Sequence, residues 1–168
     1  MSSPMRAEHG PVARWLHWGF ILLFVYGLSK QLDELEELEA PGLLEQEMLF
    51  AGVFLLVVIA RFLYMRFTVP SVVPSDAPLY QRRLASAVHL GMYAGLVAIP
   101  ASGLWIGALY GDGVREGAMM EAALLLHEIA VNGTYTLSVG HVAAALYHRR
   151  LRDGIWDAMV PFWRESGS

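Results

Sequence analysis

Histidine is the residue type in this sequence with the most chemistry to offer, because an imidazole can bind a metal ion, carry a proton or hydrogen-bond a carbonyl group. The chain has six histidines, and two of them, His127 and His141, lie fourteen residues apart in an apolar stretch that ends at His148. In an α-helix, fourteen residues return almost to the same face and climb roughly 21 Å. The two imidazoles are therefore expected to point into one interior at two depths.

The elements that must position these histidines are predicted to be membrane helices. The chain has 168 residues, of which 55% are hydrophobic, with a mean hydropathy of +0.42. Four windows are apolar on all sides and have about the length that crosses a hydrocarbon core of roughly 30 Å. The sequence predicts an all-α integral membrane protein, a four-transmembrane-helix up-down bundle forming one domain over residues 1–168, with spans at 15–31, 47–67, 84–109 and 121–148.

Positive charge predicts how this bundle is oriented. The connector 68–83 contains Pro70, Pro74 and Pro78 and is expected to be extended. Only Lys30 and Arg115 fall on the opposite side of the predicted bundle. By the positive-inside rule both termini are expected to be cytoplasmic. The arginines on the side of the termini and this connector are Arg6, Arg14, Arg61, Arg66, Arg82, Arg83, Arg149, Arg150, Arg152 and Arg164.

The opposite side of the bundle is predicted to be acidic. One interpretation is a docking face for a basic partner, and the other, more frequent in proteins, is a set of solvated loops. The chain has no cysteine, which excludes disulfides, thiolate ligation of haem and iron–sulfur clusters. No nucleic-acid partner is expected. The acidic residues are Asp33, Glu34, Glu36, Glu37, Glu39, Glu45, Glu47, Asp112, Glu116, Glu121 and Glu128.

Three histidines are predicted to lie at one depth of the membrane. His17 and His89 fall near the cytoplasmic starts of the first and third windows, and His141 falls near the cytoplasmic end of the fourth. A polar imidazole in hydrocarbon is costly unless it is paired. A b-type haem needs one nitrogen ligand on each side of its iron, and facing helices of a bundle can supply both. The alternative, that each histidine only bonds a neighbouring carbonyl, is less favoured for several histidines at one level.

Four groups of residues carry a resemblance to a known family. They are Arg14-Trp15-Leu16-His17-Trp18; His89-Leu90-Gly91-Met92-Tyr93 with Pro100-Ala101-Ser102-Gly103; Leu126-His127-Glu128; and His141-Val142-Ala143-Ala144-Ala145-Leu146-Tyr147-His148 with Arg152-Asp153. Together they resemble the bacterial cytochrome b561 family, which is related to the b-type cytochrome subunits of nickel–iron hydrogenases. The resemblance covers essentially the whole chain.

The resemblance implies a bacterial inner-membrane protein that holds two b haems and exchanges electrons with the quinone pool. The family's cytoplasmic-side haem is held by histidines that match His17 and His141. Its periplasmic-side haem is held by a histidine early in the second span and by one that matches His127. These residues are the haem iron ligands that the resemblance implies.

The second span departs from the family pattern. The position of the missing ligand falls on Glu47, with Met48 beside it, and no histidine lies between residues 18 and 88. Met48 could give a His/Met haem, Glu47 could leave a weak or open coordination position, or the site could be empty, with His127 bonded to Glu128 or a carbonyl. An empty or altered site ranks slightly ahead of ligation by Met48, since methionine in an apolar helix usually serves packing.

Further residues are predicted to contact the cofactor or a quinone. His89 is a reserve iron ligand and otherwise lines a quinone pocket or bonds a haem propionate. His148 is expected to contact a propionate or a quinone. Arg14 and Arg61 are candidate propionate partners, because a guanidinium binds a carboxylate bidentately.

Two functions from different classes remain open. The first is a membrane b-type cytochrome that transfers electrons between a cytoplasmic-side haem b and the quinone pool or a partner redox protein, with enzymatic quinone oxidoreduction left undecided. The second is a non-catalytic anchor or accessory subunit of a larger respiratory or photosynthetic complex, with one structural haem or none. Membrane lipid and quinone are the expected partners, with a basic periplasmic redox protein or a larger membrane complex as a further one.

Overall fold

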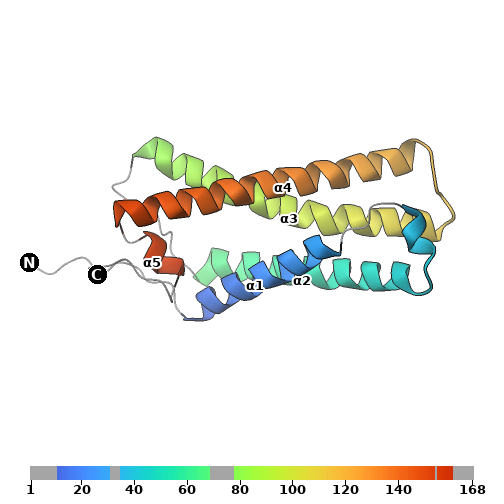
Figure 1. Cartoon of the computed structure of the whole chain (residues 1–168), viewed down its shortest axis with the longest axis horizontal. Helices are drawn as coiled ribbons and strands as arrows, with labels where there is room; N and C mark the ends of the chain where they lie inside the picture. Colours follow the sequence, from blue (N-terminus) through green and yellow to red (C-terminus); the bar gives the residue numbers. More distant parts are fainter. Residues whose placement is uncertain (1–10, 31–34, 69–77, 154, 161–168) are drawn as a thin grey trace, which may run out of the picture.

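The structure is a computed structural model that describes residues 11–30, 35–68, 78–153 and 155–160 (Figure 1). Predictions that fall on other residues lie outside this part of the chain. They concern Arg6, Asp33, Glu34, Pro70, Pro74 and Arg164.

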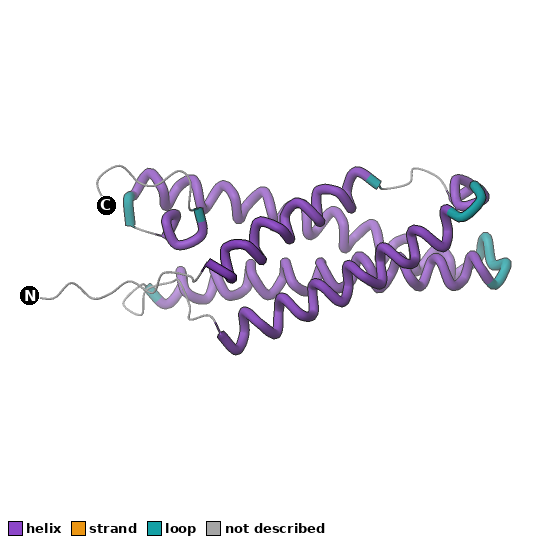
Figure 2. Tube along the Cα trace, turned by 90° about the horizontal axis from the view of Figure 1, so that it is seen from below, coloured by secondary structure: helices purple, strands orange, loops and turns teal. Residues whose placement is uncertain are grey.

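The described residues form helices, with no strand among them. Long helices run along the length of the molecule, and Figure 1 shows the starts of α1 and α3 and the ends of α2 and α4 at the same end. Figure 2 shows the same lengthwise arrangement from below. The predicted all-α class is therefore confirmed. The elements are α1 (Pro11–Ser29), η1 (Leu35–Glu39), α2 (Leu43–Thr68), α3 (Leu79–Gly111), α4 (Ala118–Leu151) and α5 (Ile155–Met159).

Three helices of the described chain, α1, α2 and α3, are long and apolar enough to cross a membrane. The 19 residues of α1 correspond to about 28 Å, close to the thickness of a hydrocarbon core. Helix α4 has 34 residues but is not among the three. It carries His127, Glu128 and Asn132 within its apolar stretch, and these polar side chains lower its hydropathy.

The start of α3 corrects the predicted connector. Residues 79–83 were expected to belong to an extended loop, but they form the first turns of α3, which begins at Leu79. Pro78 stands immediately before this helix with φ −52° and ψ 141°. A proline suits a helix start because the first N–H groups have no partner within the helix. The loop proline thus marks the beginning of the helix.

Helix α3 is the centre of the packing, since its main contacts are with both α2 and α4. Gly95 allows the close approach of α3 and α4, because a β-carbon there would overlap Thr134 Oγ1 and lie 3.2 Å from Thr134 Cβ. Helix α1 packs on α2 with far fewer contacts. The bundle is therefore tight along α2, α3 and α4 and loose at α1.

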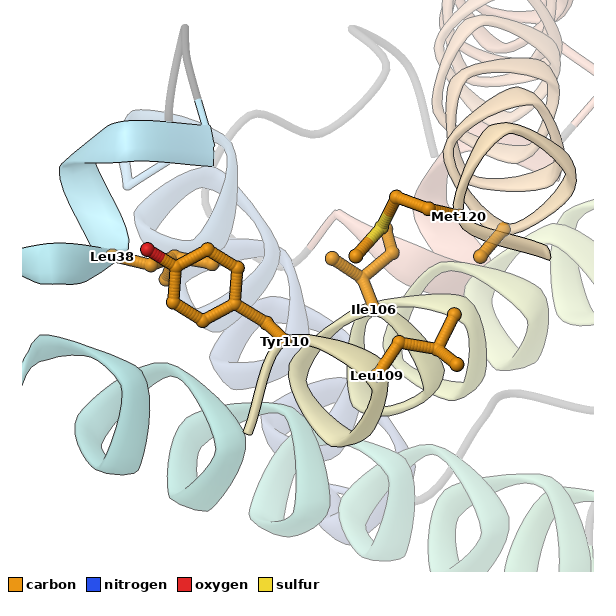
Figure 3. Packing of buried hydrophobic residues seen from close by; sticks show 6 residues of the cluster. Leu38, Ile106, Leu109, Tyr110 and Met120 are labelled. Atoms are coloured by element: carbon orange, nitrogen blue, oxygen red, sulfur yellow. The ribbon is translucent and has the colours of Figure 1, made fainter. Parts of the chain in front are cut away.

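Two apolar clusters occupy different levels of the bundle. At the end where α3 meets α4, Leu38 of η1 lies against Tyr110, and Ile106, Leu109 and Met120 complete the cluster (Figure 3). In the interior, a second cluster joins α1, α2 and α3 through Phe20, Phe54, Val58 and Leu96. This second cluster lies next to the polar residues described below.

Candidate functional site

A polar cluster crosses the interior at the level of His17. The Arg61 guanidinium of α2 donates a hydrogen bond to His17 Nδ1 of α1, with a separation of 3.0 Å, and another to Tyr93 Oη of α3 at 2.5 Å. The same guanidinium lies 5.2 Å from the centre of the Phe20 ring. Three helices therefore meet around one cation.

The fourth helix brings His141 to this cluster. The imidazoles of His89 on α3 and His141 on α4 lie with ring centres 5.3 Å apart in an edge-to-face arrangement. Arg61 is close enough to His141 to act on it electrostatically. The structure thus gathers His17, His89, His141 and Arg61, four of the residues singled out in the sequence, around one level of the bundle.

The residues at this level fit a haem. Imidazoles come from α1, α3 and α4, and Arg61 lies among them without an ion pair to any carboxylate of the described chain. Arg61 Nε is buried and has no hydrogen-bond partner there. A buried donor without a partner is costly, and a propionate carboxylate is the acceptor that a guanidinium binds best.

A second level is built around His127 on α4. Ser102 on α3 is 1% exposed, and its Oγ lies 3.0 Å from His127 Nδ1 and 2.6 Å from the carbonyl oxygen of Ala98. If the serine hydroxyl donates to the carbonyl, it accepts a hydrogen bond from Nδ1–H, which leaves Nε2 with a free lone pair. The predicted partners of this histidine were Glu128 or a carbonyl, and the structure gives it the side chain of Ser102 together with a backbone contact to Ile99.

Glu47 and Met48 of α2, which stand where the family has a histidine ligand, contact other residues. The Glu47 carboxylate lies 3.8 Å from Lys30 Nζ, which follows the end of α1. Met48 packs against α3, where its sulfur would lie 3.2 Å from a β-carbon built on Gly107. Its thioether therefore fills a gap between α2 and α3, and ligation by Met48 stays a prediction.

His148 is held at the end of α4. Its Nδ1 lies 2.5 Å from Asp153 Oδ2, while Asp153 Oδ1 accepts a hydrogen bond from the Ile155 backbone N–H at the start of α5. Arg149 lies over the Trp156 ring at 5.3 Å. The turn between α4 and α5 therefore fixes the orientation of this imidazole.

Sequence reasoning missed three hydrogen-bond partners of the site: Ser102 for His127, Asp153 for His148 and Tyr93 for Arg61. All three lay inside the residue groups that carried the family resemblance, but their spacing alone gave them no role. Arg14 is half-buried on α1, three residues before His17. No group of three or more His, Asp or Glu side chains in the described ranges could hold a free metal ion.

A helical fold with helices long enough to cross a membrane and imidazoles on separate helices is what a membrane b-type cytochrome, a carrier of electrons, requires. The model of the prokaryotic cytochrome b561 family matches residues 8–162, and the chain belongs to this family. It is also similar to "Cytochrome b561 homolog 1" of Escherichia coli (strain K12), with 28% identity over 166 aligned residues that cover 88% of this chain and 93% of that protein. No solved structure matches the chain significantly. Membership of this family implies a b-type haem.

Proposed function

We propose that this cytochrome carries one haem b between His17 and His141 and passes electrons between that haem and the quinone pool. The observation that supports the proposal is that α1, α2, α3 and α4 meet around the cation Arg61, whose buried Nε has no hydrogen-bond partner in the described chain. All four long helices span the membrane in this proposal, α4 included. When bound, the haem supplies a one-electron carrier.

The chain's own residues prepare the site for such a ligand. In the structure His17 Nδ1 accepts a hydrogen bond from Arg61, so its proton is on Nε2. A haem iron held by His17 would need the lone pair of Nε2, so the imidazole would carry its proton on Nδ1 and give up the hydrogen bond from Arg61. The Arg61 guanidinium would then donate to a haem propionate, which would also give Nε an acceptor.

The charge distribution supports the proposed orientation. The end of the bundle that contains the start of α1 and the end of α4 carries the arginines Arg14, Arg149, Arg150 and Arg152. The positive-inside rule then places both termini in the cytoplasm of a bacterial cell, with the haem on that side of the inner membrane. His148 and Asp153 lie hydrogen-bonded to each other at this end, where a quinone would exchange protons with water.

The number of haems per chain tests the proposal most directly. A pyridine haemochromogen assay on the purified protein is expected to give one haem b per chain, because the second span has no histidine opposite His127. A ratio of two would require a replacement ligand near Met48 and would correct the proposal at the second level. A ratio of zero in protein purified from haem-replete cells would refute it.

Arg61 is predicted to raise the reduction potential of the haem. The reduced haem carries one more negative charge than the oxidised form, so a nearby cation favours reduction. Arg61→Gln is expected to lower the potential by some tens of millivolts, on the order of what one partly screened charge supplies. The reduction potential is measured by a redox titration in which visible absorption reports the fraction of reduced haem.

A matched control for this prediction is Arg66→Gln, which removes an exposed arginine near the end of α2. Because solvent screens that charge, its removal should leave the potential nearly unchanged. An unchanged or raised potential in Arg61→Gln would show that Arg61 does not act on the haem.

A further inference from the structure

A row of polar side chains runs along the outer face of α4. Glu128, Asn132 and Thr136 follow one another at intervals of four residues and are exposed. The covered face of the same helix contains Ala130 and Thr134 and packs on α3. Residues four apart share one helical face, so the three polar side chains form a continuous stripe that points away from the bundle. We call it the outer stripe of α4.

The outer stripe lies on an open face of α4, among the apolar side chains of Leu125, Ile129 and Leu137. The Thr136 hydroxyl donates to the Asn132 backbone carbonyl at 2.8 Å. The side chains of Glu128 and Asn132 have no partner in the described part of the chain. This face therefore presents an unpaired amide and an unpaired carboxyl group.

Leaving these polar side chains unpaired costs free energy if α4 spans the membrane, as it does in the proposed topology. The 34 residues of α4 extend about 51 Å, so a hydrocarbon core of roughly 30 Å covers the middle of the helix, where Asn132 and Thr136 lie. Polar side chains in membrane helices almost always face a partner, because lipid offers no hydrogen bonds. The outer stripe of α4 thus requires a partner within the membrane.

We propose that the outer stripe of α4 is the interface of a homodimer. A carboxamide has both a donor and an acceptor, so two copies of Asn132 satisfy each other across a two-fold axis normal to the membrane. That axis keeps both copies in the same orientation, and the second amide hydrogen of each Asn132 is then available to Glu128 of the other copy, one helical turn away. A partner of different sequence would need its own matching polar group at the same depth.

The backbone of α4 permits such an approach. A β-carbon built on Gly133 or Gly140 meets no atom within 4 Å, so both positions are open toward the outside. Small residues on a membrane helix let a second helix come close enough for interhelical hydrogen bonds to form. The two glycines lie seven residues apart, beside the outer stripe of α4.

Disulfide cross-linking in native membranes tests the interface, because the chain has no cysteine of its own. Thr136→Cys is expected to give a disulfide-linked species of twice the 18.6 kDa mass under mild oxidation. Leu56→Cys is the matched control, since Leu56 is 68% exposed on α2, away from the proposed interface. Equal cross-linking at both positions would indicate random collision, and a product of any other mass would indicate a foreign partner; either result would overturn the proposal.

A second set of variants separates the interface from the electron-transfer site. Adding Asn132→Leu to Thr136→Cys should reduce cross-linking several-fold, while Asn132→Gln, which keeps the amide, should retain most of it. The haem absorption spectrum should stay the same in all of them. Unchanged cross-linking in Asn132→Leu would contradict the interface, whereas a parent protein with no haem spectrum would contradict the proposed function instead.

Discussion

Replacement of His141 by alanine is expected to remove nearly all the haem absorption of the purified protein, and His17→Ala is expected to do the same. Under the proposed function each imidazole supplies one of the two axial ligands, and they come from separate helices. Removing either one leaves a single ligand from a half-buried histidine, which holds a b haem weakly since no covalent bond attaches it. The reduced-minus-oxidised spectrum, scaled to protein concentration, measures the loss.

The histidine that neighbours His141 provides the control for this experiment. His89→Ala also removes an imidazole from the same cluster, 5.3 Å from the His141 ring centre, but His89 is exposed. The His89→Ala variant is expected to keep most of the haem. Circular dichroism of all three variants would show whether the helices remain. Full haem content in a folded His17→Ala, His141→Ala double variant would refute the ligand pair.

Gly95→Val is expected to destabilise the bundle at the contact between α3 and α4. The Cβ atom and its two methyl groups would have to occupy the place of Thr134, which is 1% exposed on α4. The carbonyl oxygen of Ala130 lies 3.6 Å from the same β-carbon position, so backbone limits the space as well. Helices α3 and α4 must then separate, at a cost of about 1–3 kcal/mol for an overpacked core. Thermal unfolding in detergent measures the effect.

Two variants show whether the helix contact causes this loss. Gly52→Ala places a methyl group on α2 where a β-carbon meets no atom within 4 Å, and it should be neutral or stabilising because alanine favours helix over glycine by about 1 kcal/mol. Adding Thr134→Gly to Gly95→Val should restore part of the stability by removing the overlapping side chain. Equal losses for Gly95→Val and Gly52→Ala would mean that the close approach is unimportant.

Much of the fold could be predicted from sequence, because the length and hydrophobicity of a segment indicate a membrane helix. The four predicted windows fall on α1 to α4, although α1 ends at Ser29 rather than at residue 31. The residue at which α3 starts was harder to predict from sequence. Residues 79–83 were assigned to the connector because its prolines predicted an extended loop, whereas Pro78 in fact sets the helix start by its backbone geometry.

The side-chain partners of the site could be predicted only in part. Helical spacing brought His17 and His141 to one level, since depth follows directly from residue number along a helix. The bonds of His127 to Ser102 and of His17 to Arg61 depend on how each helix is rotated about its axis and on how closely its neighbours approach. Residue spacing within one segment does not contain that information.

Helix α1 has a consequence for how this protein is made. It carries His17 but packs on its neighbour α2 with far fewer contacts than join α2, α3 and α4. Ligation of one iron by His17 and His141 would clamp this loosely attached helix to the rest of the bundle. Newly inserted chains should therefore become resistant to membrane proteases only after they bind the porphyrin. The supply of iron and porphyrin in the cell would then determine the abundance of the protein.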